Sequence, residues 1–129
     1  MDTICDIFVN GAVIEDELEQ IVGRIVGGRA EFGVITGGGL EIGVMRNKFH
    51  DAAKAAEGVD QFMRFPFYMD VVPEDPLEPM DSYLAAVERL LDGLRAAGLW
   101  FVTAADFEDD LRDYGASPPR DRTRPIAVD

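Results

Sequence analysis

Apolar residues recur at the three-to-four-residue spacing of an amphipathic helix in two stretches of the chain, residues 14–26 and 82–97. Glycine follows each stretch and can adopt the left-handed conformation that ends a helix. Carboxylates stand early in the first stretch, where the helix dipole favours negative charge. Asp81 or Ser82 is placed to cap the second stretch. The pattern therefore predicts two long helices, each with one buried side.

Alternating apolar and polar residues predict strands in four further stretches. They are residues 3–9, 30–35, 40–45 and 62–72. In the second of these, Phe32 is expected to share a face with Val34, opposite Ile35. Glycines at residues 37–39 are expected to join this strand to the next as a hairpin.

Two features predict where strands lie in the sheet. Residues 99–103 are almost entirely apolar, which is typical of a central strand covered on both faces, so Trp100 is expected in the core. Pro66 has no N–H to donate, so residues 62–72 are expected at an edge of the sheet or with a bulge. The more polar face of that stretch carries Arg64, Tyr68 and Asp70.

The elements follow one another in the order β-α-β-β-β-α-β, and a short acidic helix is expected after the last strand. Short connections and right-handed crossovers allow few arrangements of such a series. The sequence therefore predicts an α+β fold, a ferredoxin-like α/β sandwich with both long helices on one face of a single sheet. Residues 1–115 are expected to form one domain, and residues 116–129, with prolines and arginines, a flexible tail.

The chain is strongly acidic: its 129 residues include 25 Asp and Glu against 12 Lys and Arg, a formal net charge of −13. A field of this sign repels nucleic acids and anionic membranes and attracts basic proteins. Cys5 is the single cysteine, so no internal disulfide can form, and its apolar surroundings predict a buried side chain. The sequence shows neither a signal segment nor an apolar run of membrane-spanning length, which predicts a cytoplasmic protein.

Two clusters of carboxylates stand out. The first follows the last predicted strand and holds Asp106, Glu108, Asp109, Asp110 and Asp113. The second lies among prolines before the second helix and holds Glu74, Asp75, Glu78 and Asp81. On a helix, Phe107, Leu111 and Tyr114 would share one side and dock on the domain. The carboxylates would then face water, either as a solvated surface or as a docking face for the arginines and lysines of a partner.

The sequence shows no complete motif for calcium binding, phosphate binding or catalysis. The acidic spacing lacks the alternate carboxylates and central glycine of a calcium loop, and the glycine-rich turn lacks the lysine of a phosphate loop. His50 beside Asp51 could act as a base, but no nucleophile is placed for it, which favours a solvated loop histidine. We expect no catalytic site, no metal and no cofactor.

Three stretches together resemble small bacterial immunity proteins of polymorphic or contact-dependent toxin systems, particularly those of myxobacteria and actinobacteria. They are "FGVITGGGLEIGVMRN", "FMRFPFYMDV" and "VERLLDGLRAAGLWFVTAADFEDDL". The resemblance implies a non-enzymatic inhibitor that blocks a cognate toxin, often a basic nuclease. A basic protein partner is then expected on the two carboxylate clusters, with Phe107, Tyr114 or Tyr68 as an aromatic anchor.

Two alternatives stay open. One is a small-molecule-binding protein or enzyme that uses the open sheet face near Arg64, Tyr68 and Asp70. The other is a homo-oligomeric domain that pairs through the Pro66 strand or through an apolar sheet face. The sequence is compatible with a monomer or a homodimer.

Overall fold

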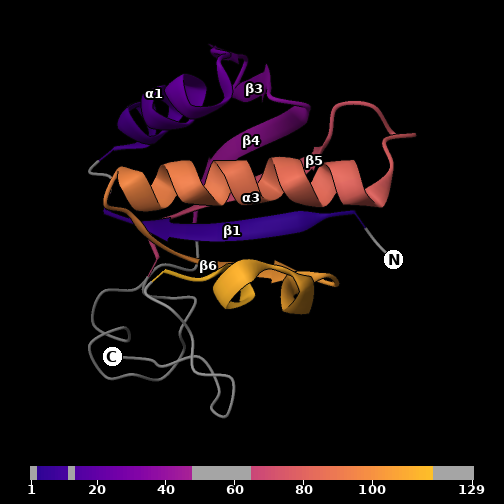
Figure 1. Ribbon diagram of the computed structural model, residues 1–129. Helices are drawn as coiled ribbons and strands as arrows, with labels where there is room; N and C mark the ends of the chain where they lie inside the picture. The colour runs from indigo at the N-terminus through magenta and orange to yellow at the C-terminus, as the bar shows by residue number, and fades with distance from the viewer. Residues whose placement is uncertain (1–2, 12–13, 48–64, 118–129) are drawn as a thin grey trace.

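A six-stranded antiparallel sheet forms the centre of the structure, a computed structural model that describes residues 3–11, 14–47 and 65–117. The strands lie side by side in the order β2-β3-β4-β5-β1-β6. Their bounds are β1 (Cys5–Asn10), β2 (Ala30–Glu31), β3 (Val34–Gly37), β4 (Leu40–Arg46), β5 (Phe67–Pro73) and β6 (Trp100–Ala105). The long helices are α1 (Glu15–Val26) and α3 (Met80–Ala96) (Figure 1). The expected α+β class and both long helices are confirmed.

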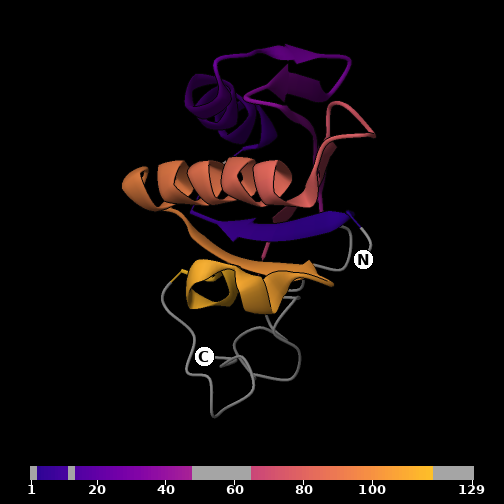
Figure 2. The ribbon, with the colours of Figure 1, turned by 45° about the vertical axis from the view of Figure 1, so that its right-hand side comes forward.

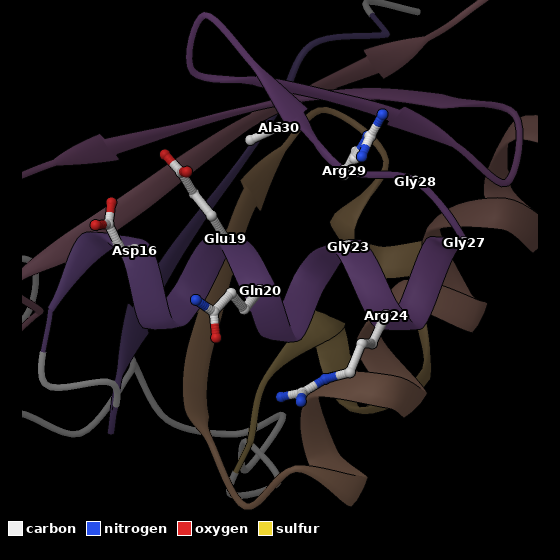
Figure 3. A pocket seen from close by; sticks show the side chains of 9 residues that line it. All are labelled: Asp16, Glu19, Gln20, Gly23, Arg24, Gly27, Gly28, Arg29 and Ala30. Atoms are coloured by element: carbon white, nitrogen blue, oxygen red, sulfur yellow. The ribbon is translucent and has the colours of Figure 1, made fainter.

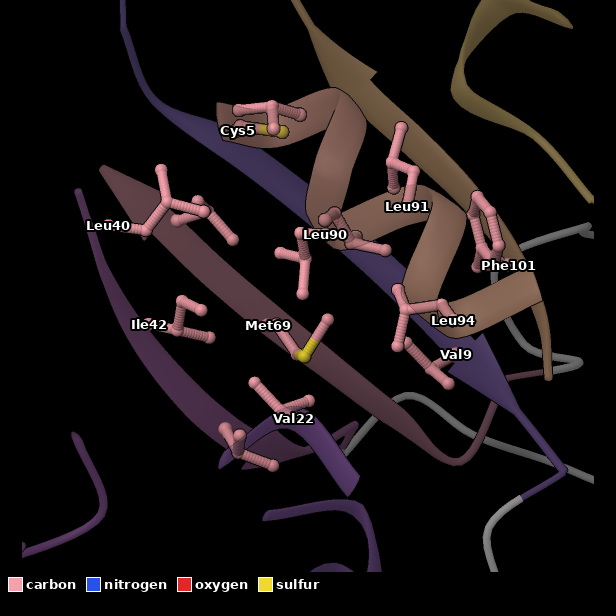
Figure 4. Packing of buried hydrophobic residues seen from close by; sticks show 14 of the residues in the cluster. Cys5, Val9, Val22, Leu40, Ile42, Met69, Leu90, Leu91, Leu94 and Phe101 are labelled. Carbon is pink, nitrogen blue, oxygen red and sulfur yellow. The ribbon is translucent and has the colours of Figure 1, made fainter. Parts of the chain in front are cut away.

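Both helices lie on the same face of the sheet (Figures 1 and 2). The core between the layers is built from the inward-facing residues of the strands and from one side of each helix. Figure 4 shows Met69 of β5 among Val22 of α1 and Leu90 and Leu94 of α3. In β1 the strict alternation of buried and half-buried residues places Cys5 in this core, as its apolar surroundings predict. No helix within the described ranges is long and apolar enough to cross a bilayer.

The second helix begins slightly earlier than expected and without a side-chain cap. The N-cap of α3 is Pro79, so neither Asp81 nor Ser82 takes that role. The proline ring fixes φ near the value of −58° seen here, which suits the change from extended chain to helix. Its carbonyl then accepts the first helical hydrogen bond from the Tyr83 N–H, at 3.0 Å.

The expected continuous strand over residues 30–35 is wrong, because the chain turns within it. Phe32 and Gly33 both have positive φ, 54° and 79°, as in the tight two-residue turns of hairpins. The turn separates β2 from β3 and changes which residues face the helices. Ile35 is fully buried, whereas Phe32 is wholly exposed at the tip of the turn and does not share the core.

β5 lies inside the sheet, so the expectation that Pro66 marks an edge strand or a bulge is wrong. β5 pairs with β4 on one side and with β1 on the other. Pro66 directly precedes Phe67, the first paired residue, so its missing N–H interrupts no bond of the ladder. Its carbonyl accepts a hydrogen bond from the N–H of Asn47 at 2.8 Å. This strand offers no free edge for pairing with a second copy.

β6 lies at an edge of the sheet and not at its centre. It pairs with β1 on one side, and on the other it forms an isolated antiparallel bridge between Phe101 and Ser117. Trp100 is 52% exposed and is not a core residue. The strand is nevertheless apolar because Phe101 faces the helices while Val102 packs against Ala116 on the opposite face. A strand that is apolar on both faces, such as β6, can therefore lie at the edge of a sheet.

Two short 3-10 turns replace the expected acidic helix after β6. They are η2 (Glu108–Asp110) and η3 (Arg112–Gly115). Leu111 between them is extended (φ −89°, ψ 148°), and Asp113 has a positive φ of 54°. Consecutive carboxylates repel one another and aspartate has low helix propensity, which disfavours a continuous helix here.

The fold continues past residue 115. Ala116 is buried and Ser117 pairs with β6, so these two residues of the expected tail belong to the folded part. Residues 118–129 lie outside the described residues, as do residues 62–64 of the strand that the sequence predicts over 62–72.

Candidate functional site

The two acidic segments leave the sheet at the same end. Cys5, at the start of β1, pairs with Val71 in β5 and with Ala105 in β6. β5 and β6 therefore both finish beside the start of β1, and the chain that follows each strand emerges there (Figure 1). We call the two acidic segments at this end of the sheet, taken together, the acidic end. It comprises Glu74, Asp75, Glu78, Asp81, Asp106, Glu108, Asp109 and Asp110.

The loop between β5 and α3 is held in one shape by hydrogen bonds. The N–H of Glu74 donates to the carbonyl of Gly39 at 3.0 Å, which ties the loop to the turn between β3 and β4. Oδ1 of Asp75 accepts from the N–H of Leu77 at 2.9 Å, and the Asp75 carbonyl accepts from the N–H of Glu78 at 2.9 Å. The loop presents the Leu77 side chain, 88% exposed, among carboxylates.

The segment after β6 is anchored by two apolar side chains. Phe107 and Leu111 are fully buried in the main core. The N–H of Asp110 donates to the Phe107 carbonyl at 2.9 Å, which closes the first turn. Asp109 and Asp110 are exposed, and within the described residues neither forms an ion pair. The expected docking of Phe107 and Leu111 on the domain is confirmed.

The arginine inside this segment points away from the carboxylates around it. Arg112 pairs with Asp92 and with Glu88 of α3, the latter at 3.4 Å. Arg95 also pairs with Asp92, at 3.0 Å. The hydrogen bond from Arg112, and the charges of both arginines, hold the pKa of the Asp92 carboxyl below its usual range. These cations therefore neutralise the C-terminal half of α3 and not the acidic end.

Some expected contact residues lie elsewhere. Phe107 is fully buried in this chain's own core, so it cannot serve as an anchor for a partner. Asp113 follows Arg112 in η3 and is half-buried, away from the acidic end. Tyr114 lies in η3, but its side chain is outside the described residues. The sequence analysis missed Leu77, whose only signal is a lone large apolar residue among prolines and carboxylates.

The open face of the sheet carries the alternative candidate residues. Tyr68 of β5 stacks on Phe8 of β1, with ring centroids 5.8 Å apart. Asp70 lies directly opposite Asp6 in the same pair of strands. Arg64, the third residue expected there, lies outside the described residues.

Asp6 is the titratable group that the sequence analysis missed on this face. Burial, then hydrogen bonding to Asp70, then the charge of Asp70 raise the pKa of the Asp6 carboxyl to about 7. One oxygen of Asp6, Oδ1, is buried and has no hydrogen-bond partner among the residues that the structure describes. The alternation within β1 does predict that Asp6 points away from the core, because its neighbour Cys5 points into it. The position of Asp6 beside Asp70, however, depends on the register between distant strands.

The remaining sequence candidates give no further site. Gly38 and Gly39 form the turn between β3 and β4, as expected for a hairpin. His50 and Asp51 lie outside the described residues. In the described part of the chain, no three His, Cys, Asp or Glu side chains are grouped so that they could hold a metal ion.

Comparison with known proteins adds no relative. No protein-family model, no curated protein and no solved structure matches this chain.

Proposed function

We propose that the chain is a cytoplasmic binding protein of the immunity type, which inhibits a basic toxin by covering its active site with the acidic end. The observation that carries the proposal is that two acidic segments, from distant parts of the sequence, leave the sheet at the same end. Chance alone would not favour this placement, because like charges repel and such a surface costs stability. When a basic partner binds, attraction between its cations and these carboxylates compensates for that repulsion.

The proposed mechanism divides the work between charge and an apolar anchor. Carboxylates such as Asp109 and Asp110 attract arginines and lysines around the toxin's active site, which speeds association and selects the partner. Leu77, held outward by the hydrogen bonds of its loop, enters an apolar pocket of the toxin. The toxin is then blocked by occlusion and no chemical step is needed.

We also propose that the fold is a variant of the ferredoxin-like sandwich. The partial order β4-β5-β1-β6, with two helices on one face, supports this assignment. The β2–β3 hairpin would be an addition at the β4 edge. The acidic end would then lie where the second βα connection leaves the sheet.

The experiment that tests the function is capture of proteins from the native host on the immobilised chain, eluted with a salt gradient. A basic protein released only at high salt, whose toxic activity the chain inhibits, is the expected result. The charge-reversal variant Asp109→Lys with Asp110→Lys should slow association about tenfold and flatten its salt dependence. A matched variant with the same charge change elsewhere, Asp16→Lys with Glu31→Lys, should retain most of the association rate. Equal rates for both variants would contradict the proposal.

The Asp6–Asp70 pair favours a second candidate function, binding of a small ligand at the open face. A carboxyl group that titrates near neutral pH is common where protons are exchanged with a ligand. Titration with a library of small molecules, followed by NMR, tests this candidate. Shift changes gathered on Phe8, Tyr68 and Asp70 would support it, and changes that avoid this face would remove it.

A further inference from the structure

A pocket of about 490 Å³ lies along α1, between the helix and the chain that leads into β2 (Figure 3). This volume is in the range of small-molecule sites. Asp16, Glu19 and Arg24 line it from the helix, and Arg29 and Ala30 line it from the following segment. It is separate from the acidic end and from the open face of the sheet.

The pocket is hollow because the chain reverses there without side chains. The N–H groups of Gly27 and Gly28 both donate to the carbonyl of Gly23, at 2.9 and 3.0 Å, and Gly27 has a φ of 76°. A Cβ on Gly23 would lie 2.8 Å from the Gly28 carbonyl oxygen, and one on Gly28 only 2.2 Å from that of Thr36. The close backbone packing therefore requires glycine at these two positions of the pocket lining.

The two ends of the pocket carry opposite charges. Asp16 and Glu19 stand toward the start of α1, and Arg24 and Arg29 flank the groove from opposite sides toward its end (Figure 3). Arg24 and Arg29 are exposed and form no ion pair with another described residue. At the other end, burial and the neighbouring carboxylates raise the pKa of the Glu19 carboxyl. Among the residues that the structure describes, none of these four charged side chains forms an ion pair.

The helix dipole explains only part of this arrangement. It favours carboxylates in the first turn and cations in the last, which accounts for Asp16 and Arg24. Glu19 lies beyond the first turn, and Arg29 lies outside the helix. Their placement at opposite ends of the hollow suits a ligand that itself carries two charges of opposite sign.

The spacing of these residues along the helix sets the length of such a ligand. The backbone positions of Asp16 and Arg24 are eight residues apart, or roughly 12 Å along a helix with a rise of 1.5 Å per residue. An extended peptide spans about 3.3–3.6 Å per residue, so three residues cover roughly 10 Å. A single amino acid, whose ammonium and carboxylate groups share one carbon, spans much less than this backbone separation.

We propose that this pocket binds a short zwitterionic peptide of about three residues, with its ammonium group at Asp16 and Glu19 and its carboxylate at Arg24 and Arg29. The side-chain amide of Gln20 lines the pocket between the two charged ends and offers both a donor and an acceptor to a peptide bond. The Ala30 methyl group and the glycine backbone leave room for small side chains.

The test is calorimetric titration of the full chain with trialanine, N-acetyl-trialanine, trialanine amide and free alanine. Trialanine should bind with a saturable signal, and loss of either terminal charge should weaken binding about tenfold. Free alanine should bind more weakly than trialanine. Equal binding of all four compounds, or no saturable binding of trialanine at millimolar concentration, would overturn the proposal.

Variants assign each end of the peptide. Glu19→Gln should weaken trialanine about tenfold without further weakening the N-acetylated form, and Arg29→Gln should do the same with respect to the amide. Glu41→Gln and Arg89→Gln make the same charge changes outside the pocket and the acidic end and should bind like the parent. Circular dichroism establishes that each variant is folded. A loss that is identical for all peptide forms, or that also occurs in the control variants, would contradict the assignment.

Discussion

The ring of Phe107 packs edge-on against the ring of Tyr83, with centroids 5.6 Å apart and an interplanar angle of 75°. The Tyr83 hydroxyl in turn lies 2.5 Å from the carbonyl oxygen of Thr3 and 3.0 Å from that of Val71, and its single hydrogen is shared between these two acceptors. A single aromatic pair therefore joins the acidic segment after β6 to α3, to β5 and to the chain entering β1. The geometry of the acidic end depends on it.

Phe107→Ala should lower the free energy of unfolding by about 3–5 kcal/mol, because it removes a fully buried ring from the core. Urea denaturation followed by circular dichroism measures this. Asp109→Ala, two residues away and exposed, is the matched control and should change the value by no more than about 0.5 kcal/mol. A loss below about 1 kcal/mol for Phe107→Ala would mean that the segment does not dock as described.

Stability should depend on pH through Asp6. Its pKa is raised from 3.8 to about 7 in the folded chain, so between these values the native state holds a proton that the unfolded state has released. The free energy of unfolding should therefore fall as the pH rises from about 4 to 7, by roughly 1–2 kcal/mol once partial exposure is allowed for.

Asp6→Asn should remove most of this slope and raise stability at pH 8, since the amide cannot ionise. Urea denaturation at a series of pH values is the measurement. Asp75→Asn, on an exposed loop, should keep the slope of the parent. An unchanged slope in Asp6→Asn would show that the carboxyl is not the group responsible.

Phe32→Asn should stabilise the chain by about 1 kcal/mol, because asparagine adopts positive φ more readily than phenylalanine and is favoured in two-residue hairpin turns. The Phe32 ring is wholly exposed, so its removal sacrifices no core packing. Phe32→Ala, which keeps an unfavourable left-handed residue, should gain less. Thermal unfolding by calorimetry compares the three chains, and equal gains for both variants would exclude backbone strain as the cause.

Cys5 should resist thiol reagents in the native state. Burial, with the nearby charges of Asp6 and Glu108, raises the pKa of its thiol to about 12, so almost no reactive thiolate forms at neutral pH. Labelling should follow the opening of the fold and become fast in urea. The destabilised Phe107→Ala variant should label faster than the parent. Rapid labelling of the native parent chain would contradict the burial of β1.

Leu77→Ala should weaken binding to the proposed basic partner mainly through faster dissociation, about tenfold or more if Leu77 fills a pocket. Its stability should stay within about 0.5 kcal/mol of the parent, since the side chain is exposed. Surface plasmon resonance separates the two rates. Ile14→Ala, another exposed apolar residue, is the control and should leave both rates unchanged.

The local pattern of apolar and polar residues was sufficient to predict the helices and to predict which residues of most strands face the core. α1 and α3 follow the apolar spacing closely, and the alternation in β5 places Met69 inside and Asp70 outside as expected. These features depend on neighbours a few residues apart. The turn at Phe32 was missed because phenylalanine is a strand former and gives no turn signal, although the following Gly33 does.

The arrangement of the candidate site could not be read from the sequence. Whether two acidic segments leave the sheet at the same end depends on the pairing of β1 with β5 and with β6, which is set by packing between distant residues. The register of β1 with β5 brings Asp6 opposite Asp70. An apolar strand such as β6 can lie at an edge when other chain segments cover both of its faces, and composition alone does not distinguish this from a central position.

Neither edge strand of the sheet offers a long stretch of unpaired backbone with which a strand of another molecule could pair. At β6 the Phe101 N–H donates to the Ser117 carbonyl at 2.9 Å and the Ser117 N–H returns a bond of 2.8 Å, while at the opposite border β2 is only two residues long. Exposed strand borders are where chains recruit one another into fibrils. This protein should therefore stay dispersed when concentrated, and shortening it before Ser117 should make it prone to aggregate.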